Sequence, residues 1–155
     1  MKATVLLFLL LELASARRFT RGSEVAPAAL CKRTIASVEM LDDGKKVLFK
    51  FEDKGPSIAF GVANPDTSTS LFTNALATVE DEPSHVMDDC ATQTTSLLKR
   101  GYKKVAHASF HVTRRALRMD LQDAKGATRR LFLFCAQTLD DVSVNGFDPV
   151  MIQAF

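Results

Sequence analysis

The chain is poor in the residues that mark several specialised classes of protein. Its 155 residues include no tryptophan, three cysteines, seven glycines and five prolines. So few glycines and prolines exclude a fibrous or low-complexity protein, and three cysteines are too few for a disulfide-framework scaffold. The sequence also has no Asn-x-Ser/Thr site for N-glycosylation.

Familiar catalytic motifs are also missing. The sequence has no Gly-x-x-x-x-Gly-Lys-Ser/Thr, Gly-x-Gly-x-x-Gly, His-Glu-x-x-His, Gly-x-Ser-x-Gly or Cys-x-x-Cys. These absences count against nucleotide hydrolysis, dinucleotide chemistry, zinc proteolysis and serine hydrolysis by their usual routes. We therefore expect no catalytic residues, no cofactor and no metal site.

What remains is the composition of one ordinary folded domain. Hydrophobic residues make up 46% of the chain and charged residues 25%, with a net charge of +2. Residues 34–155 carry 14 basic and 16 acidic side chains, so the expected folded part is slightly acidic. That balance argues against a dedicated nucleic-acid-binding protein.

Residues 1–16 have the pattern of a secretory signal peptide. Lys2 gives a positive start, residues 5–11 are apolar, and Ala14-Ser15-Ala16 is typical of a cleavage site. The apolar run is shorter than the roughly 20 residues of a membrane-spanning helix. We therefore expect a secreted, soluble protein without a transmembrane anchor.

The segment expected after cleavage, residues 17–33, is strongly basic. It contains five basic residues and only Glu24 as an acidic one, and it shows little periodicity. We interpret residues 17–33 as a basic N-terminal arm and residues 34–155 as a single domain.

Three cysteines, Cys31, Cys90 and Cys135, would meet an oxidising compartment in an exported chain. The simplest outcome is one disulfide bond and one free or intermolecular thiol, and three pairings are open. Cys135 lies in an apolar run and can be a small buried hydrophobic residue. In that case Cys31 and Cys90 form the disulfide bond.

Hydrophobic periodicity predicts both strands and helices. Alternation predicts strands at residues 34–40, 46–52, 57–63, 103–112, 115–122 and 130–136. Helical spacing is present at residues 71–79 and 84–100, and Asp148-Pro149 resembles the start of a terminal helix through Phe155. The predicted fold class is α+β, a mainly antiparallel sheet with helices packed on it.

This order of elements ends in a Phe-x-Pro-Val-x-x-x-x-Phe segment, residues 147–155, which follows a hydrophobic strand. In that respect the chain resembles the PsbP-like proteins of the photosynthetic lumen, over residues 45–155. The resemblance implies an α/β/α sandwich and a role as a lumenal accessory protein.

The histidines give a candidate site of low specificity. His107 and His111 fall on one face of a predicted strand, and imidazole suits zinc or copper, with His85, Asp88 or Asp89 as further ligands. Residues four apart on a strand are about 13 Å apart, which is too far for both rings to bind one ion. We expect a solvated sheet face there instead.

Basic residues give a second candidate site, a possible patch for an anionic ligand. Its members lie in the last turn of the second predicted helix, at the start of the next strand or around the strand turn after it: Lys99, Arg100, Lys103, Lys104, Arg114 and Arg115, with Arg118, Arg129 and Arg130 nearby. Solvated sheet edges also carry such charges, because charge blocks edge-to-edge pairing.

Two classes of function follow from these observations. The first is a secreted, non-enzymatic binding protein, an extracellular factor or toxin-like effector that contacts a protein or a small ligand. The second is a small secreted enzyme with a site around His107 and His111. The oligomeric state is open.

Overall fold

The described residues form a sandwich of two antiparallel β-sheets with one short α-helix. The computed structural model describes residues 23–41, 44–63, 74–80, 88–111, 113–136 and 147–155. Strands account for 57% of these residues, and α2 is the α-helix among them. The predicted α+β class is therefore wrong, and so is the α/β/α sandwich that the resemblance to PsbP-like proteins implies.

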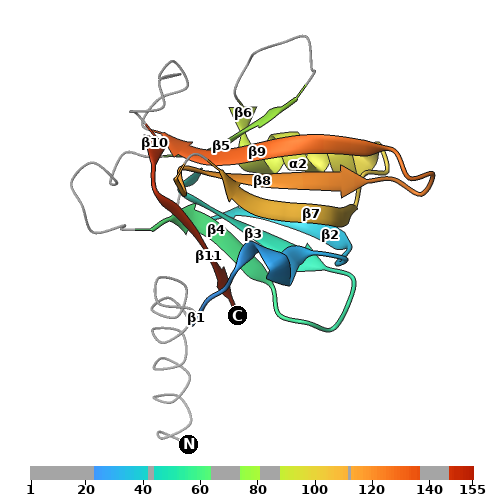
Figure 1. The fold of residues 1–155 in the computed structure, drawn as a ribbon, viewed down its shortest axis with the longest axis horizontal. Helices are drawn as coiled ribbons and strands as arrows, with labels where there is room; N and C mark the ends of the chain where they lie inside the picture. Colours follow the sequence, from blue (N-terminus) through green and yellow to red (C-terminus); the bar gives the residue numbers. More distant parts are fainter. Residues whose placement is uncertain (1–22, 42–43, 64–73, 81–87, 112, 137–146) are drawn as a thin grey trace, which may run out of the picture.

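The first sheet has five strands in the order β1-β11-β4-β3-β2 (Figure 1). Their bounds are Ser23–Glu24 for β1, Ile35–Leu41 for β2, Lys46–Phe51 for β3, Ile58–Val62 for β4 and Val150–Ala154 for β11. A short 3-10 helix, η1, spans Pro27–Leu30 between β1 and β2.

The second sheet has six strands in the order β6-β5-β9-β8-β7, with β10 also paired to β9. Their bounds are Asn74–Val79 for β5, Asp88–Asp89 for β6, Lys104–His111 for β7, Ala116–Gln122 for β8, Thr128–Ala136 for β9 and Phe147–Asp148 for β10. Helix α2 spans Cys90–Lys99.

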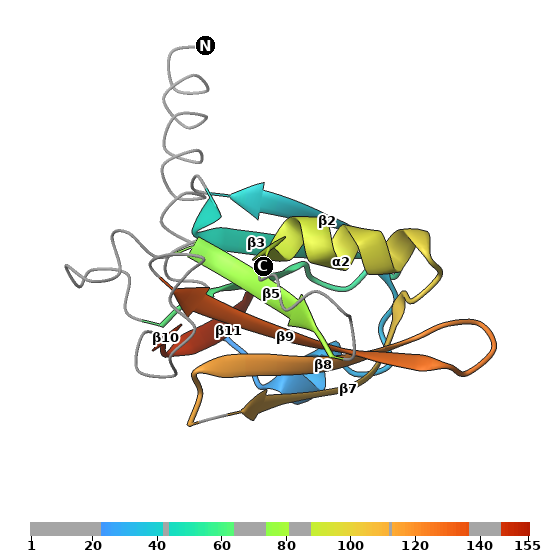
Figure 2. The ribbon, with the colours of Figure 1, turned by 90° about the horizontal axis from the view of Figure 1, so that it is seen from above.

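The two sheets are joined at several places. The C-terminal chain pairs with β9 as β10 and then, after Pro149, with β4 as β11, so it passes from one sheet to the other. At the start of β2, Thr34 pairs with Lys104 of β7. Helix α2 contacts both β2 and β5, and it lies between the two sheets on the side opposite β11 (Figure 2).

Side chains from both sheets form one continuous hydrophobic core. Phe49 and Phe60 of the first sheet are fully buried in the same cluster as Leu117, Met119 and Leu133 of the second. On the outer face of the second sheet, a separate buried cluster contains Leu76, Ala116, Phe134 and Ala136. Sheet β5-β9-β8 is therefore apolar on both faces near the C-terminal end of β9.

The predicted strands lie where alternation placed them. All six appear as β2, β3, β4, β7, β8 and β9, with ends shifted by at most two residues. The hairpins between β2 and β3 and between β8 and β9 turn at Gly44 and Gly126, which have φ angles of +93° and +89°. Glycine takes such angles without the steric cost that a side chain would add.

The predicted helix at residues 71–79 is wrong from residue 74 onward, because this segment is strand β5; residues 71–73 lie outside the described residues. Ala75 and Ala77 face the core, whereas Leu76 lies in the outer cluster. Burial on both faces places apolar residues at helical spacings as well as at alternate positions. Periodicity alone does not distinguish the two structures in that case.

The predicted C-terminal helix is also wrong. Asp148 lies in β10, Pro149 lies between β10 and β11, and Val150 and Ile152 are fully buried. The carbonyl oxygen of Pro149 accepts a hydrogen bond from the N–H of Ala63. Because Pro149 has no N–H group, it cannot donate a hydrogen bond to a neighbouring strand. The Asp-Pro pair therefore marks the crossing between the sheets.

The helix predicted at residues 84–100 is shorter in the structure. It begins at Cys90, after β6, and Asp89 caps it by accepting a hydrogen bond of 2.8 Å from the backbone N–H of Thr92. The expected cap Ser84 lies outside the described residues.

The predicted disulfide bond is wrong. Cys31, Cys90 and Cys135 are all free thiols, and no two of them lie at a distance that allows a disulfide bond. Cys90 and Cys135 are fully buried, and burial raises the pKa of both thiols far above the usual range. A buried thiol with a raised pKa is a poor nucleophile.

The described part of the basic segment 17–33 packs on the sandwich. Leu30 is fully buried, and Arg33 forms a bidentate ion pair with Asp53, with distances of 2.8 and 3.0 Å, while lying over the Phe51 ring.

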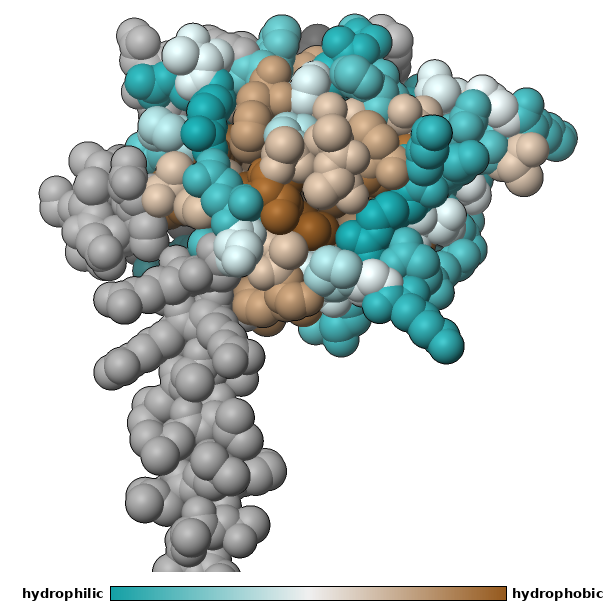
Figure 3. All heavy atoms as spheres, turned by 60° about the horizontal axis from the view of Figure 1, so that its bottom comes forward, coloured by the Kyte–Doolittle hydropathy of each residue, from teal (hydrophilic) through white to brown (hydrophobic). Residues whose placement is uncertain are grey.

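Hydrophobic side chains reach the surface on the side of the sandwich that carries β1 and β11 (Figure 3). Val25 and Ala154 are partly buried against the core there, and the C-terminal Phe155 is 43% exposed. Among the described residues, no helix is long and apolar enough to cross a membrane.

Candidate functional site

The predicted anionic-ligand patch is divided between two ends of the β7–β8 hairpin. Lys103 and Lys104 lie at the start of β7, whereas Arg114 and Arg115 lie in the turn after it. The eight residues of β7 separate these groups by about 23 Å, at about 3.3 Å per residue. The two groups of charges therefore do not converge on one small ligand.

The group at the turn is engaged in contacts of its own. Arg114 forms an ion pair with Glu24 and lies 4.8 Å from the centre of the Phe110 ring. Arg115 is half-buried. Burial of Asp148 raises the pKa of its carboxyl group, and the positive charge of Arg115 offsets part of that rise.

The group at the start of β7 lies beside the end of α2. The chain leaves α2 through Gly101, and the N–H of Tyr102 donates to the carbonyl oxygen of Leu97, which folds Tyr102 back against the helix. Arg100 lies 5.7 Å and Arg129 lies 6.0 Å from the centre of the Tyr102 ring. Two guanidinium groups from different elements therefore share one aromatic ring.

On the outer face of the second sheet, Asp120 of β8 is the centre of a charged network. One of its carboxylate oxygens accepts a hydrogen bond from Arg118, and the other accepts one from Arg130 of β9, both at 3.1 Å. Arg130 also forms an ion pair of 3.1 Å with Glu80, which follows β5. The Asp120 side chain is 16% exposed, so this network is partly shielded from water.

The pKa of Asp120 reflects this arrangement. Burial raises the pKa, but the hydrogen bonds and charges of Arg118 and Arg130 outweigh burial and lower the pKa below its ordinary value of 3.8. Asp120 is therefore ionised at neutral pH and serves as an acceptor.

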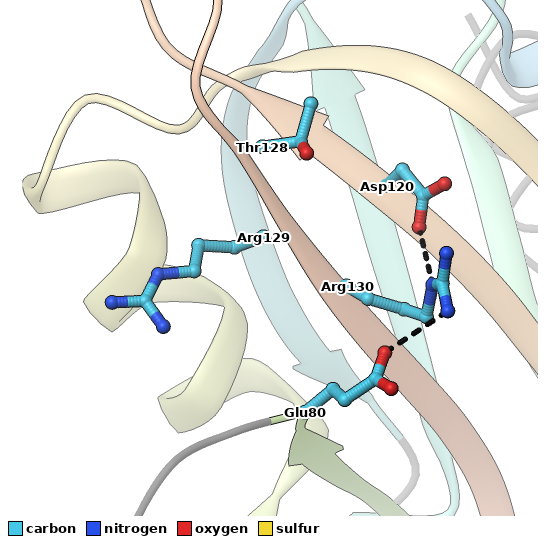
Figure 4. A pocket seen from close by; sticks show the side chains of 5 residues that line it. All are labelled: Glu80, Asp120, Thr128, Arg129 and Arg130. Atoms are coloured by element: carbon cyan, nitrogen blue, oxygen red, sulfur yellow. Dashed lines mark hydrogen bonds and ion pairs between the residues drawn. The ribbon is translucent and has the colours of Figure 1, made fainter.

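A polar surface depression of about 350 Å³ joins the charged network to the basic group. It is lined by Glu80, Asp120, Thr128, Arg129 and Arg130 (Figure 4). Arg130 lies between Asp120 and Glu80, whereas the Arg129 side chain extends toward α2. Arg129 is half-buried and forms no ion pair with any described residue.

The two candidate histidines are on this same outer face, and the described residues around them do not bring a third metal ligand or an activating group to either ring. A bulge between Val105 and His107 turns Val105 to the core and places His107 opposite Asp120 and His111 opposite Ala116. The Asp120 oxygens accept from arginines, and the His111 ring packs 5.7 Å from the Phe132 ring.

Of the other proposed metal ligands, Asp88 lies in β6, Asp89 caps α2 and His85 lies outside the described residues. Among the described residues, no group of three histidine, cysteine, aspartate or glutamate side chains could hold a metal ion.

The sequence indicated the arginines of this region but missed their partners. Tyr102 lies between α2 and β7, Asp120 lies in β8 and Glu80 follows β5. No spacing in the sequence connects these residues to Arg129 and Arg130. The clean alternation of residues 115–122 was the available signal, because it placed Arg118 and Asp120 together on the outer face.

Comparison with known proteins adds no family. The chain matches no protein-family model, no curated protein and no solved structure. Its function is therefore argued from the fold and from this region.

Proposed function

We propose that the chain is an exported, non-enzymatic binding protein that holds an anionic group of its ligand in the depression beside Arg129. A single observation carries this proposal. Arg130, which lines the depression, is paired with carboxylates. Arg129 also lines it, from the face of β9 toward α2, and has no carboxylate partner among the described residues. A half-buried cation that lacks a counter-charge gains most from an anion supplied by a ligand.

The depression favours binding over catalysis. Its acidic groups are already hydrogen-bonded to arginines, so they are poor proton acceptors for a substrate, and the buried thiols are inert. A small enzyme with a site at His107 and His111 was the alternative prediction, and neither ring contacts a described group that would activate it.

Export is the second part of the proposal, and it depends on residues 1–16 of the sequence. We expect the native protein to have the mass of residues 17–155 with three thiols, one of which, Cys31, is partly exposed. Intact mass spectrometry after alkylation measures the mass of the chain, and comparison of native with unfolding conditions gives the number of exposed and of buried thiols. A native mass that includes residues 1–16 would contradict export.

Binding can be tested with inorganic sulfate as the probe. Sulfate that binds the folded state alone stabilises it by RT ln(1 + [L]/Kd), which is about 1.4 kcal/mol at ten times Kd and raises Tm by a few degrees. We expect this rise in the wild type and its loss in Arg129→Gln. The reference is sodium chloride at equal ionic strength, because sulfate also stabilises proteins without binding to them.

Arg114→Gln is the matched control, because it removes the same charge at the other end of the hairpin. Its Tm should rise with sulfate as much as that of the wild type. An equal rise in all three proteins would mean that sulfate acts without a site at Arg129, and would refute the proposal.

A further inference from the structure

The basic group beside Arg129 extends well beyond the depression. Hydrogen bonds along the backbone bring three chain segments to one end of the sandwich. Lys103 donates its N–H to Gln122, and Lys32 donates its N–H to the carbonyl oxygen of Val105. Lys104, Gln122 and Thr128 then form a row across β7, β8 and β9.

Backbone pairing therefore brings the segments that carry several cations to this end, with Lys104 on the outer face of the sheet and Arg129 on the face toward α2. The basic end, as we call it, consists of Lys32, Lys99, Arg100, Lys103, Lys104 and Arg129. Adjacent strands are about 4.8 Å apart, so the row from Lys104 to Thr128 crosses about 10 Å. Except for Arg129, which is half-buried, these cations are exposed.

The acidic residues at the same end are largely occupied. Asp53 forms the bidentate ion pair with Arg33, and Asp123 accepts hydrogen bonds from the backbone N–H groups of Lys125 and Ala127 within its own turn. Glu52, whose N–H donates to Thr34, is exposed and reduces the local charge. The basic end keeps a clear excess of positive charge in a domain that is slightly acidic as a whole.

We infer that the basic end binds a sulfated polysaccharide, with one sulfate group in the depression at Arg129 and others along Lys103 and Lys104. This inference rests on the proposed function, because it extends the anion site at Arg129. The cations belong to separate elements and line an open surface, which suits an extended polyanion better than a compact one. Export would bring the protein to such polysaccharides.

Nucleic acid suits this surface less well. Proteins that bind single strands stack bases on exposed aromatic rings. Tyr102, an aromatic residue next to the basic end, packs against the core and lies near Arg100 and Arg129. Its ring is therefore engaged by the protein itself.

The test is binding of the full chain to heparin, measured as Kd at several sodium chloride concentrations. We compare the wild type with the double variant Lys103→Gln/Arg129→Gln. Loss of two ionic contacts should weaken binding about tenfold at low salt and lower the slope of log Kd against log[NaCl] by about 1.5. The control is the double variant Lys50→Gln/Arg114→Gln, whose residues pair with Glu39 and Glu24 elsewhere.

The two double variants change the net charge equally, so they separate a located site from attraction by overall charge. The inference predicts that the control stays within about twofold of the wild type. Equal weakening of both variants, or no retention of the wild type on heparin, would overturn it. Equal affinity for single-stranded DNA would also overturn it, since the surface would then accept any polyanion.

Single variants keep this inference distinct from the proposed function. If Arg129→Gln abolishes the sulfate-induced rise in Tm while Lys103→Gln leaves heparin binding unchanged, the anion site stands and the polysaccharide surface fails. If sulfate has no effect on Tm but Lys103→Gln still weakens heparin binding, the site at Arg129 is wrong and the basic end is a purely exposed surface. The polysaccharide inference then fails as well, because it places one sulfate group at Arg129.

Discussion

The variant Phe60→Ala is expected to lose about 3–5 kcal/mol of its free energy of unfolding. Phe60 lies in the middle of β4, pairs with Val47 of β3 and Ile152 of β11, and is fully buried. Removing its ring leaves a cavity. The neighbouring strands cannot move in to fill this cavity, because backbone hydrogen bonds within the sheet fix their positions. The free energy of unfolding of a domain of this size is about 5–15 kcal/mol in total. The urea concentration at the unfolding midpoint should therefore be much lower in the variant.

The matched control for Phe60→Ala is Phe155→Ala. Phe155 is 43% exposed at the end of the chain, and we expect its replacement to cost about 1 kcal/mol or less. Equal losses in the two variants would contradict the position of β4 at the centre of the five-stranded sheet, between β3 and β11.

The second large effect is expected for Asp120→Asn, and it depends on pH. At neutral pH the variant weakens two charge-assisted hydrogen bonds and leaves Arg118 and Arg130 without a shared anion, at a cost of about 1–2 kcal/mol. The Nε of Arg118 is buried and has no hydrogen-bond partner, so this guanidinium has little else to compensate it.

The sign of the pH dependence follows from the lowered pKa of Asp120. A carboxylate whose pKa is lower in the folded than in the unfolded state stabilises the fold above its unfolded pKa, here about 3.8. That stabilisation is lost as the pH falls through the lower, folded value. The difference between the wild type and Asp120→Asn should therefore be largest near pH 7, begin to shrink as the pH falls toward about 3.8, and vanish only below the lower, folded pKa.

Urea unfolding at pH 7 and at the lowest pH at which the protein stays folded measures this difference. Glu39→Gln is the control, since Glu39 and Lys50 form an ion pair whose side chains are almost half exposed. Exposed pairs contribute about 0–1 kcal/mol, so its effect should be small at either pH. A difference between the wild type and Asp120→Asn that persists unchanged in acid would show that Asp120 acts through packing and not through its charge.

Local alternation was sufficient to predict the hairpins. In β8, Leu117, Met119 and Leu121 face the core while Arg118 and Asp120 face outward, so one face of the strand is polar and the pattern is unambiguous. The glycines at the hairpin turns supplied the second signal. Both features depend only on neighbours in the sequence.

The fold class could not be predicted in the same way. Strand β5 has a buried apolar residue on its outer face as well as on its core face, because Leu76 packs in the outer cluster. In β11, the preceding Asp-Pro pair resembles a helix start, yet it marks the crossing between two sheets. Both cases depend on contacts with segments more than 50 residues away along the chain.

The candidate site was predictable as a charge type but not as a geometry. Six patch residues were named from the sequence, and the length of β7 separates Arg114 and Arg115 from the others. What distinguishes Arg129 from Arg118 and Arg130 is that no carboxylate in the described part of the chain pairs with it. Because Asp120 lies in β8 and Glu80 follows β5, only the assembled sheet reveals that difference.

The most direct test of an anion site at Arg129 is an NMR titration of the ¹⁵N-labelled full chain with sulfate, against chloride at equal ionic strength. The account predicts saturable shifts confined to the Arg129 side-chain Nε and to the backbone amides around Thr128 and Tyr102. Arg129→Gln should abolish them, while Arg114→Gln should leave them unchanged. Weak, unsaturated shifts spread over basic residues at both ends of the β7–β8 hairpin would contradict the account.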